Sequence, residues 1–321
     1  TNNAALQANV SGGYNTAVGS GALQQNTVSN NTAVGYTALK NNTTGTPNDA
    51  FGYQALYSNT TGSQNVGIGY QSLYSNTTGS NNTAFGYLSL NANTIGKENV
   101  AVGSYSLRLN TIGNYNIAVG LSSLYNNTTD KNNAFGYYAL KANTTGAYNS
   151  AFGHKALASN TTGAYNTSAG STAMYENISG DYNTALGFHS LYNNISGSEN
   201  TAIGTDTLFF NQTGIQNVVV GSGAGYYVQG LNNNTYIGYW AGRYSDGNNN
   251  VFIGNEANIS GSNKLVISSF NTSTPLIYGE FDNKLVKIDG NVCSTQNMCA
   301  TNFILTSDEK IKTNILPISI T

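Results

Sequence analysis

Apolar and polar positions recur along most of the chain with a spacing of 17 residues, shortened to 16 at three steps. A typical unit reads "NTAFGYLSLNANTIGKE", in which a glycine follows an apolar residue. Fifteen such glycines mark the units: Gly19, Gly35, Gly52, Gly69, Gly86, Gly103, Gly120, Gly136, Gly153, Gly170, Gly187, Gly204, Gly221, Gly238 and Gly254. A fixed period of this length predicts a repeat architecture, in which small modules stack on one another.

Aligning the units on this marking glycine shows fixed columns of residues. Asparagine stands four residues before the glycine in every unit, and a small residue such as Ala33 usually stands two before it. An apolar residue such as Val34 or Phe51 stands directly before the glycine. Leucine stands four residues after it in eleven of the first twelve units, with Met174 in the tenth, and asparagine stands seven after it in all twelve.

The unit predicts an all-β fold made of short strands. Glycine and β-branched residues are frequent, and no apolar stripe with helical spacing persists. The runs "TAFGY" and "LSL" predict two short strands per unit, and "NTTG" supplies a turn. We therefore expect a parallel β-solenoid of fifteen coils, with a rise of ~4.8 Å per coil and a length of roughly 70 Å.

The columns also predict how each coil is filled. We expect the apolar column before the glycine and the leucine column to fill the interior, and the small column to lie where backbones approach closely. Stacking of the asparagines four residues before the glycine predicts an amide ladder along the axis. A coil of 17 residues encloses little volume, so a core shared among three chains is expected.

Composition argues against several classes of function. Only 8% of the residues are charged and the net charge is −2, so no surface for nucleic acid is expected. No apolar stretch of ~18 residues occurs, so no membrane insertion is expected. His154 and His189 are the only histidines, and no metal site or cofactor is expected. Paired carboxylates at recurring positions, which a glycoside hydrolase needs, are missing as well.

Charged residues become denser after the repeats, and this change sets the expected domain boundaries. Residues 1–12 form a lead-in, residues 13–262 the β-solenoid shaft, and residues 263–306 a small β connector. The connector contains three expected strands, "KLVIS", "PLIYGEF" and "KLVKID". It also contains Cys293 and Cys299, which either form a disulfide in an oxidising environment or remain two free thiols.

The repeat unit resembles a known family. Its core, "N-x-A-[VIF]-G", is similar to the head repeat of trimeric autotransporter adhesins over roughly residues 13–262. The resemblance implies a left-handed β-roll and a homotrimer. The adhesin repeat is shorter, so the additional residues are expected to enlarge the "NTTG" turn.

The end of the chain resembles a second family. Residues 306–318, "TSDEKIKTNILPI", are similar to the start of the endosialidase-type intramolecular chaperone domain of phage tail fibres and tailspikes. The resemblance implies that Ser307 is the nucleophile and Lys312 the base of a single self-cleavage after assembly. A lysine can act as a base when burial lowers its pKa. Because the chain ends at Thr321, residues 307–321 are expected to be only the truncated start of this domain.

Two functions from different classes agree with these observations. The first is a structural fibre or shaft of a phage tail, a virion or a cell-surface appendage. Such a fibre is extracellular, gives rigid reach and attaches to a host or a surface. The alternative is a glycan-binding adhesin or lectin that uses exposed tyrosine and asparagine columns. Apart from the single self-cleavage no enzyme activity is expected, and the expected partners are further copies of the chain and a surface glycan or receptor.

Self-cleavage gives the first testable prediction. In a longer chain that carries the whole chaperone domain, cleavage is expected at the Thr306–Ser307 bond. Ser307→Ala and Lys312→Ala should each leave the product uncut but still assembled, because the repeats need neither residue to fold. Intact-mass spectrometry measures the outcome, and cleavage that persists in Ser307→Ala would exclude Ser307 as the nucleophile.

Overall fold

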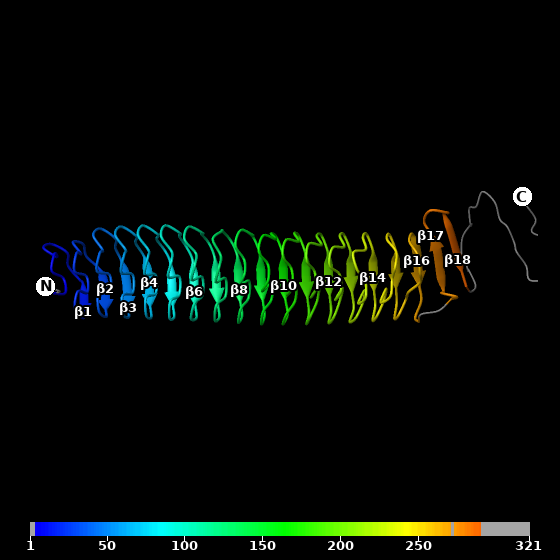
Figure 1. The fold of residues 1–321 in the computed structure, drawn as a ribbon, viewed down its shortest axis with the longest axis horizontal. Coiled ribbons are helices and arrows are strands. Elements are labelled where there is room, and N and C mark those ends of the chain that lie inside the picture. The colour runs from blue at the N-terminus through cyan, green and yellow to red at the C-terminus, as the bar shows by residue number, and fades with distance from the viewer. Residues whose placement is uncertain (1–3, 271–272, 290–321) are drawn as a thin grey trace, which may run out of the picture. The chain divides into compact units, whose positions relative to one another are not determined.

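The computed structural model describes residues 4–270 and 273–289, and this part of the chain is all-β without a helix. One short strand per coil follows another along a single stack, which confirms the predicted β-solenoid (Figure 1). The strands of the coils are β1 (Thr16–Val18), β2 (Asn31–Val34), β3 (Asn48–Phe51), β4 (Asn65–Ile68), β5 (Thr83–Phe85), β6 (Val100–Val102), β7 (Ile117–Val119), β8 (Asn133–Phe135), β9 (Ser150–Phe152), β10 (Thr167–Ala169), β11 (Thr184–Leu186), β12 (Thr201–Ile203), β13 (Val218–Val220), β14 (Thr235–Ile237) and β15 (Val251–Ile253).

The strands form one sheet in which neighbours in sequence are neighbours in space. Each strand pairs in parallel with the strand of the next coil, and equivalent residues of the repeat face each other, as Ala84 and Ala101 do. Three further strands, β16 (Lys264–Ile267), β17 (Ile277–Glu280) and β18 (Leu285–Ile288), match the strands expected in the connector. β16 still pairs in parallel with β15, whereas β17 and β18 pair antiparallel. The hand of the coil and the number of chains remain predictions.

The prediction of a second strand in "LSL" is wrong. Ser72 and Leu73 are both fully buried, and two successive residues of an extended strand cannot face the same side. Leu73 instead has a φ of 51°, in the left-handed region, and the leucines of the other coils adopt the same conformation. This backbone costs about 1–2 kcal/mol per residue, which burial of a leucine side chain, worth about 1.5–3 kcal/mol, offsets.

The interior of each coil is formed by the alanine and leucine columns. Ala84 and Leu90 are both fully buried, and the same holds for equivalent residues along the stack. The prediction that the Val/Phe/Ile column fills the interior is wrong, since Phe85 is 54% exposed and Phe152 44%. The asparagine four residues before the glycine and the alanine two before it point inward, so strand alternation turns the residue directly before the glycine outward.

The expected asparagine ladder is present and is joined by a second one. In the expected column, Asn65 Oδ1 accepts hydrogen bonds from both the backbone N–H (3.0 Å) and Nδ2 (3.2 Å) of Asn82. In the second column, seven residues after the glycine, Asn76 Nδ2 donates to Asn59 Oδ1 at 2.8 Å. Asn76 Nδ2 also donates to the carbonyl oxygen of Gly79 in its own turn at 3.0 Å. Both ladders are buried, so the polar groups of the turn are satisfied inside the coil.

The marking glycine is required by close contact between coils. Gly69 has a φ of 130°, and a Cβ atom there would lie 2.4 Å from the carbonyl oxygen of Gly86. No other residue can adopt this backbone with the next coil so near.

The interior is rebuilt near the C-terminal end of the stack. Gly225 and Gly242 replace the leucine, and Tyr236 replaces the alanine of its coil. A Cβ atom on Gly242 would lie 2.5 Å from the Tyr236 ring, so the ring occupies the space that a leucine fills elsewhere. The Tyr236 hydroxyl donates to Ser245 Oγ at 2.7 Å, and Ser245 stands at an asparagine position of the second ladder. Burial raises the pKa of Tyr236.

A substitution within the first ladder should destabilise the stack. In Asn149→Leu the backbone N–H of Asn166, which donates to Asn149 Oδ1 at 3.0 Å, loses its buried acceptor. An unpaired buried donor costs about 1–3 kcal/mol, so the thermal unfolding midpoint should fall. Asn41→Leu is the matched control, because its side chain lies six residues after a marking glycine, away from the strand face, and forms no side-chain hydrogen bond among the described residues. Equal unfolding midpoints for the two variants would contradict a stabilising role of the ladder.

The exchange of leucine for an aromatic ring can be tested with a double-mutant cycle. Gly242→Leu alone should clash with the Tyr236 ring, and Tyr236→Ala alone should leave a cavity, at a cost of about 3–5 kcal/mol. The double variant restores the alanine–leucine pair of the other coils, so its loss in unfolding free energy should be smaller than the sum of the two single losses. Chemical denaturation measures all three, and strictly additive losses would contradict this packing.

Candidate interaction surfaces

The outer side of the strands, which we call the strand face, carries a row of apolar residues beside a row that is mostly threonine and other uncharged residues. It consists of the residues one and three positions before each marking glycine, such as Phe135 and Asn133 in β8. Exposed apolar residues recur along it, including Phe51, Phe85, Phe135, Phe152, Ile203 and Ile237. Asp49 is the only charged residue at these positions. Large uncharged apolar surfaces usually mark contact with another macromolecule.

Regular pairing makes the strand face straight and periodic. Phe135 and Phe152 stack with their ring centroids 5.1 Å apart, close to the spacing of the strands. A face about 70 Å long and 10 Å wide has roughly 700 Å², near the ~800 Å² that each partner buries in a standard interface. The sequence did not reveal this face, because the residues one and two positions before the marking glycine are both apolar and either column could point inward.

Aromatic residues cover a second side of the coil, which we call the tyrosine flank and define as the residues one, two, five and six positions after each marking glycine. Tyr36, Tyr53, Tyr70 and Tyr87 stack in one row, with centroids 5.2–5.4 Å apart and planes within 17° of parallel. A separate row of Tyr148, Tyr165 and Tyr182 on another side stacks at 4.8–4.9 Å.

This stacking restricts how sugars could bind to the tyrosine rows. A sugar between two rings would need about 7 Å, twice a normal carbon–carbon contact distance. Neighbouring rings in the row from Tyr36 to Tyr87 are 5.2–5.4 Å apart, so each inner ring already has both faces covered. Ring edges and hydroxyl groups therefore face outward, and a complete row offers no ring face for sugar stacking.

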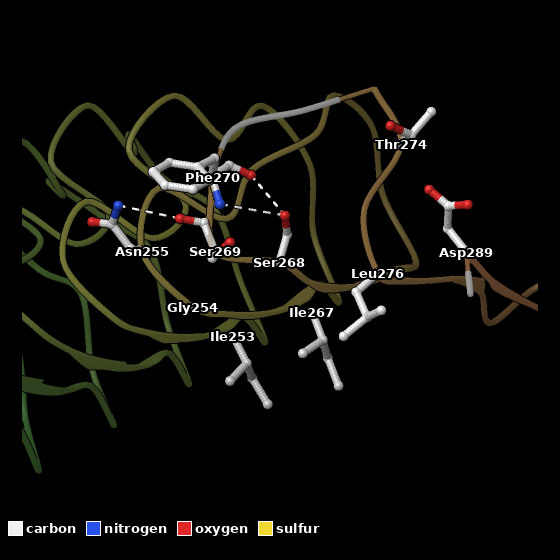
Figure 2. A pocket seen from close by; sticks show the side chains of 10 residues that line it. All are labelled: Ile253, Gly254, Asn255, Ile267, Ser268, Ser269, Phe270, Thr274, Leu276 and Asp289. Carbon is white, nitrogen blue, oxygen red and sulfur yellow. Dashed lines mark hydrogen bonds between the residues drawn. The ribbon is translucent and has the colours of Figure 1, made fainter. Parts of the chain in front are cut away.

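A hollow of about 720 Å³ lies where the solenoid meets the hairpin of β17 and β18. In Figure 2, Ile253 and Ile267 extend in the same direction, so the strand face continues from β15 into β16, and Leu276 lies next to them. Ser268 Oγ donates to the carbonyl oxygen of Phe270 at 2.8 Å, which fixes the chain at the rim (Figure 2). The hollow is therefore the end of the strand face.

Charged groups hold the hairpin against the stack. Lys264 Nζ lies 3.1 Å from Glu280 Oε1, between β16 and β17. The hydroxyl of Tyr278, helped by Asn283 and Lys264, donates a hydrogen bond to Glu280 and lowers the pKa of that carboxyl to about 2. Glu280 therefore stays ionised, and the stabilisation it contributes is lost only when the pH falls from about 4.5 towards 2.

Most residues for which the sequence predicted a chemical role fall outside the part of the chain that the structure describes. Ser307, Lys312, Cys293 and Cys299 are outside the described residues. The two histidines stand at surface positions of the tyrosine flank: the ring of His154 stacks on Tyr137, with centroids 5.3 Å apart, and His189 Nδ1 lies 3.1 Å from Asp206 Oδ1. Within residues 4–270 and 273–289, no three His, Cys, Asp or Glu side chains come together as metal ligands would.

Comparisons with protein-family models, with curated proteins and with solved structures find no match to this chain. The described residues contain no helix long and apolar enough to cross a membrane. The functional argument therefore depends on the surfaces of the stack.

Proposed function

We propose that the chain is the shaft of an extracellular trimeric fibre, part of a phage tail, a virion or a cell-surface appendage. The shaft gives rigid reach, and the fibre attaches to a host or another surface. The single observation that carries the proposal is the strand face, which has Asp49 as its only charged residue. The strands that form it follow one another along the whole stack of coils (Figure 1).

A second copy of the chain is the partner that best matches this face. Its apolar groups recur with the spacing of the coils from β1 to β15, and a partner must have the same spacing to remain in contact along the whole face. Another copy of the chain has the same repeat and therefore the same spacing. Three copies, as the resemblance to autotransporter adhesin heads implies, would enclose the three faces around one axis and remove their apolar surface from water.

Rigidity of the shaft has a direct physical source. Successive coils are joined by strand pairing, by turn hydrogen bonds and by the first amide ladder. The second ladder adds a further bond between most coils, as Asn76 and Asn93 illustrate, but it is interrupted between Asn110 and Asn127 and ends at Asn211. Bending would have to stretch these bonds together on one side of the stack. The self-cleavage by Ser307 and Lys312 belongs to the same proposal, as the step that releases the finished shaft from its assembly domain.

The alternative, a lectin whose tyrosine rows stack on sugars, has less support. Inner rings of the complete rows are covered on both faces by their neighbours, as Tyr53 and Tyr70 are. Attachment through a glycan therefore requires a place where a row is interrupted.

The oligomeric state tests the proposal. Light scattering should give the wild type three times its chain mass of 33.7 kDa. Phe135→Asp combined with Phe152→Asp should produce monomers, because a charge is costly to bury in an apolar interface. Both rings are exposed in the single chain, so the variant should fold, which circular dichroism can verify.

Phe188→Asp is the matched control for this experiment. Phe188 is 48% exposed, as much as Phe152, but it lies on the tyrosine flank. Its substitution should leave the trimer intact. A monomeric wild type, or a trimer that survives both aspartates on the strand face, would overturn the proposed interface.

A further inference from the structure

A hollow of about 390 Å³ lies in the tyrosine flank, and we call it the Ser122 notch. Its lining residues are Tyr105, Arg108, Ser122, Tyr125, Asn126 and Lys141. The volume falls within the range of small-molecule sites. The notch lies on the flank after the marking glycine and not on the strand face, so association through the strand face would leave it open.

A small side chain produces the notch, in a column whose residue differs from coil to coil. Ser122 stands two residues after its marking glycine, where the preceding coil has Tyr105 and the following coil has Tyr138. All three residues have φ values between 51° and 59°, so the backbone is the same and only the side chain differs. Two coil steps, about 9.6 Å, separate the backbones of Tyr105 and Tyr138, and of these two tyrosines only Tyr105 lines the hollow beside Ser122.

The notch has cationic walls without a carboxylate. Arg108 Cζ lies 5.3 Å from the ring centroid of Tyr105 and 5.6 Å from that of Tyr125, and Arg108 Nη1 donates to the Tyr125 hydroxyl at 2.5 Å. Lys141 Nζ lies 4.1 Å from the ring centroid of Tyr138. Among the described residues neither cation forms an ion pair. The rings therefore position two positive charges whose remaining N–H donors are free for a ligand.

The residues around the notch have a net positive charge, whereas the whole chain has a net negative charge. Residues 99–175 contain four cationic side chains, Arg108, Lys131, Lys141 and Lys155, and one acidic side chain, Asp130. The net charge of the whole chain is −2. An anion is thus favoured here and not along the rest of the shaft.

We infer that the Ser122 notch binds a carboxylated sugar of an acidic polysaccharide. The planar fork of Arg108 matches a carboxylate with two parallel hydrogen bonds, and Lys141 adds a second charge. Ser122, Asn126 and the Tyr125 hydroxyl can pair with sugar hydroxyl groups, while the Tyr105 ring provides apolar surface. Single-stranded nucleic acid is a poorer match, because it needs a continuous basic groove along its backbone.

Isothermal titration calorimetry tests the inference on the purified chain. Oligogalacturonate is the probe, and its fully methyl-esterified form, which keeps the sugar backbone but removes the charge, is the matched ligand control. The acid form should bind and the ester should not. Arg108→Gln should weaken binding about tenfold or more, as expected for loss of a charge-assisted hydrogen bond.

Two further variants separate the notch from general surface charge. Ser122→Tyr should fill the hollow without disturbing the coil, because Tyr105 and Tyr138 have the same backbone conformation in the adjacent coils, and it should abolish binding. Lys40→Gln removes a cation at the position equivalent to Arg108, with its Nζ 5.8 Å from the Tyr57 centroid, and should leave the dissociation constant unchanged.

Several results would overturn the inference. These are absence of binding by wild-type protein, an unchanged affinity in Ser122→Tyr, or an equal loss in Lys40→Gln. Tighter binding of dextran sulfate or of single-stranded DNA than of oligogalacturonate would reject the carboxylated sugar as the ligand. The inference does not depend on the number of chains in the fibre, since one chain supplies every residue of the notch.

Discussion

The fold depends on the hydrogen bonds of its buried asparagines. Each coil is so thin that the carbonyl groups of its turn, such as that of Gly79, face the interior and need a donor there. Asn76 donates to this carbonyl oxygen and to Asn59 Oδ1, and its own Oδ1 accepts from Asn93 at 2.7 Å. Aspartate has no donor, and serine has only one hydrogen, so neither could form the same set of bonds. The same asparagine side chain therefore closes the turn of its own coil and joins that coil to its neighbours.

The sequence was sufficient to predict the repeat, the parallel stack and the first asparagine ladder, because these follow from the period and from one invariant column. It did not reveal which side of the strand faces inward, since Ala50 and Phe51 are both apolar and adjacent. Asn48 contained the missing information, because a buried amide shares its side of the strand with Ala50. The run around Leu73 was mistaken for a strand because a bulky residue with positive φ is uncommon, and only the burial of both Ser72 and Leu73 makes it necessary here. The Ser122 notch was also missed, because one serine in a variable column has meaning only when its neighbours are known.

Near the C-terminal end of the stack, a change at one interior position is accompanied by changes at others. Where Tyr236 enters the interior, Gly242 makes room for its ring and Ser245 Oγ accepts a hydrogen bond from its hydroxyl. Three columns of the repeat therefore change together. The sheet then turns antiparallel at β17, and β18, which contains Lys287, is its last strand within the described part of the chain. A charged, exposed strand at this edge limits further pairing with other chains.

Inward and outward positions of the coil therefore serve different purposes. The inward asparagine and leucine positions are restricted by the ladders and by the alanine–leucine contact, whereas the buried position before the leucine accepts only small residues, such as Ala55 and Ser72. Residues of the tyrosine flank contact one another within a coil and between adjacent coils, and their identity varies along the stack, as Tyr105, Ser122 and Tyr138 show. The strand face contains almost no charge, whereas Arg108 and Lys141 lie on the tyrosine flank. Association through the first surface and recognition through the second would not compete, because they use different sides of the same coil.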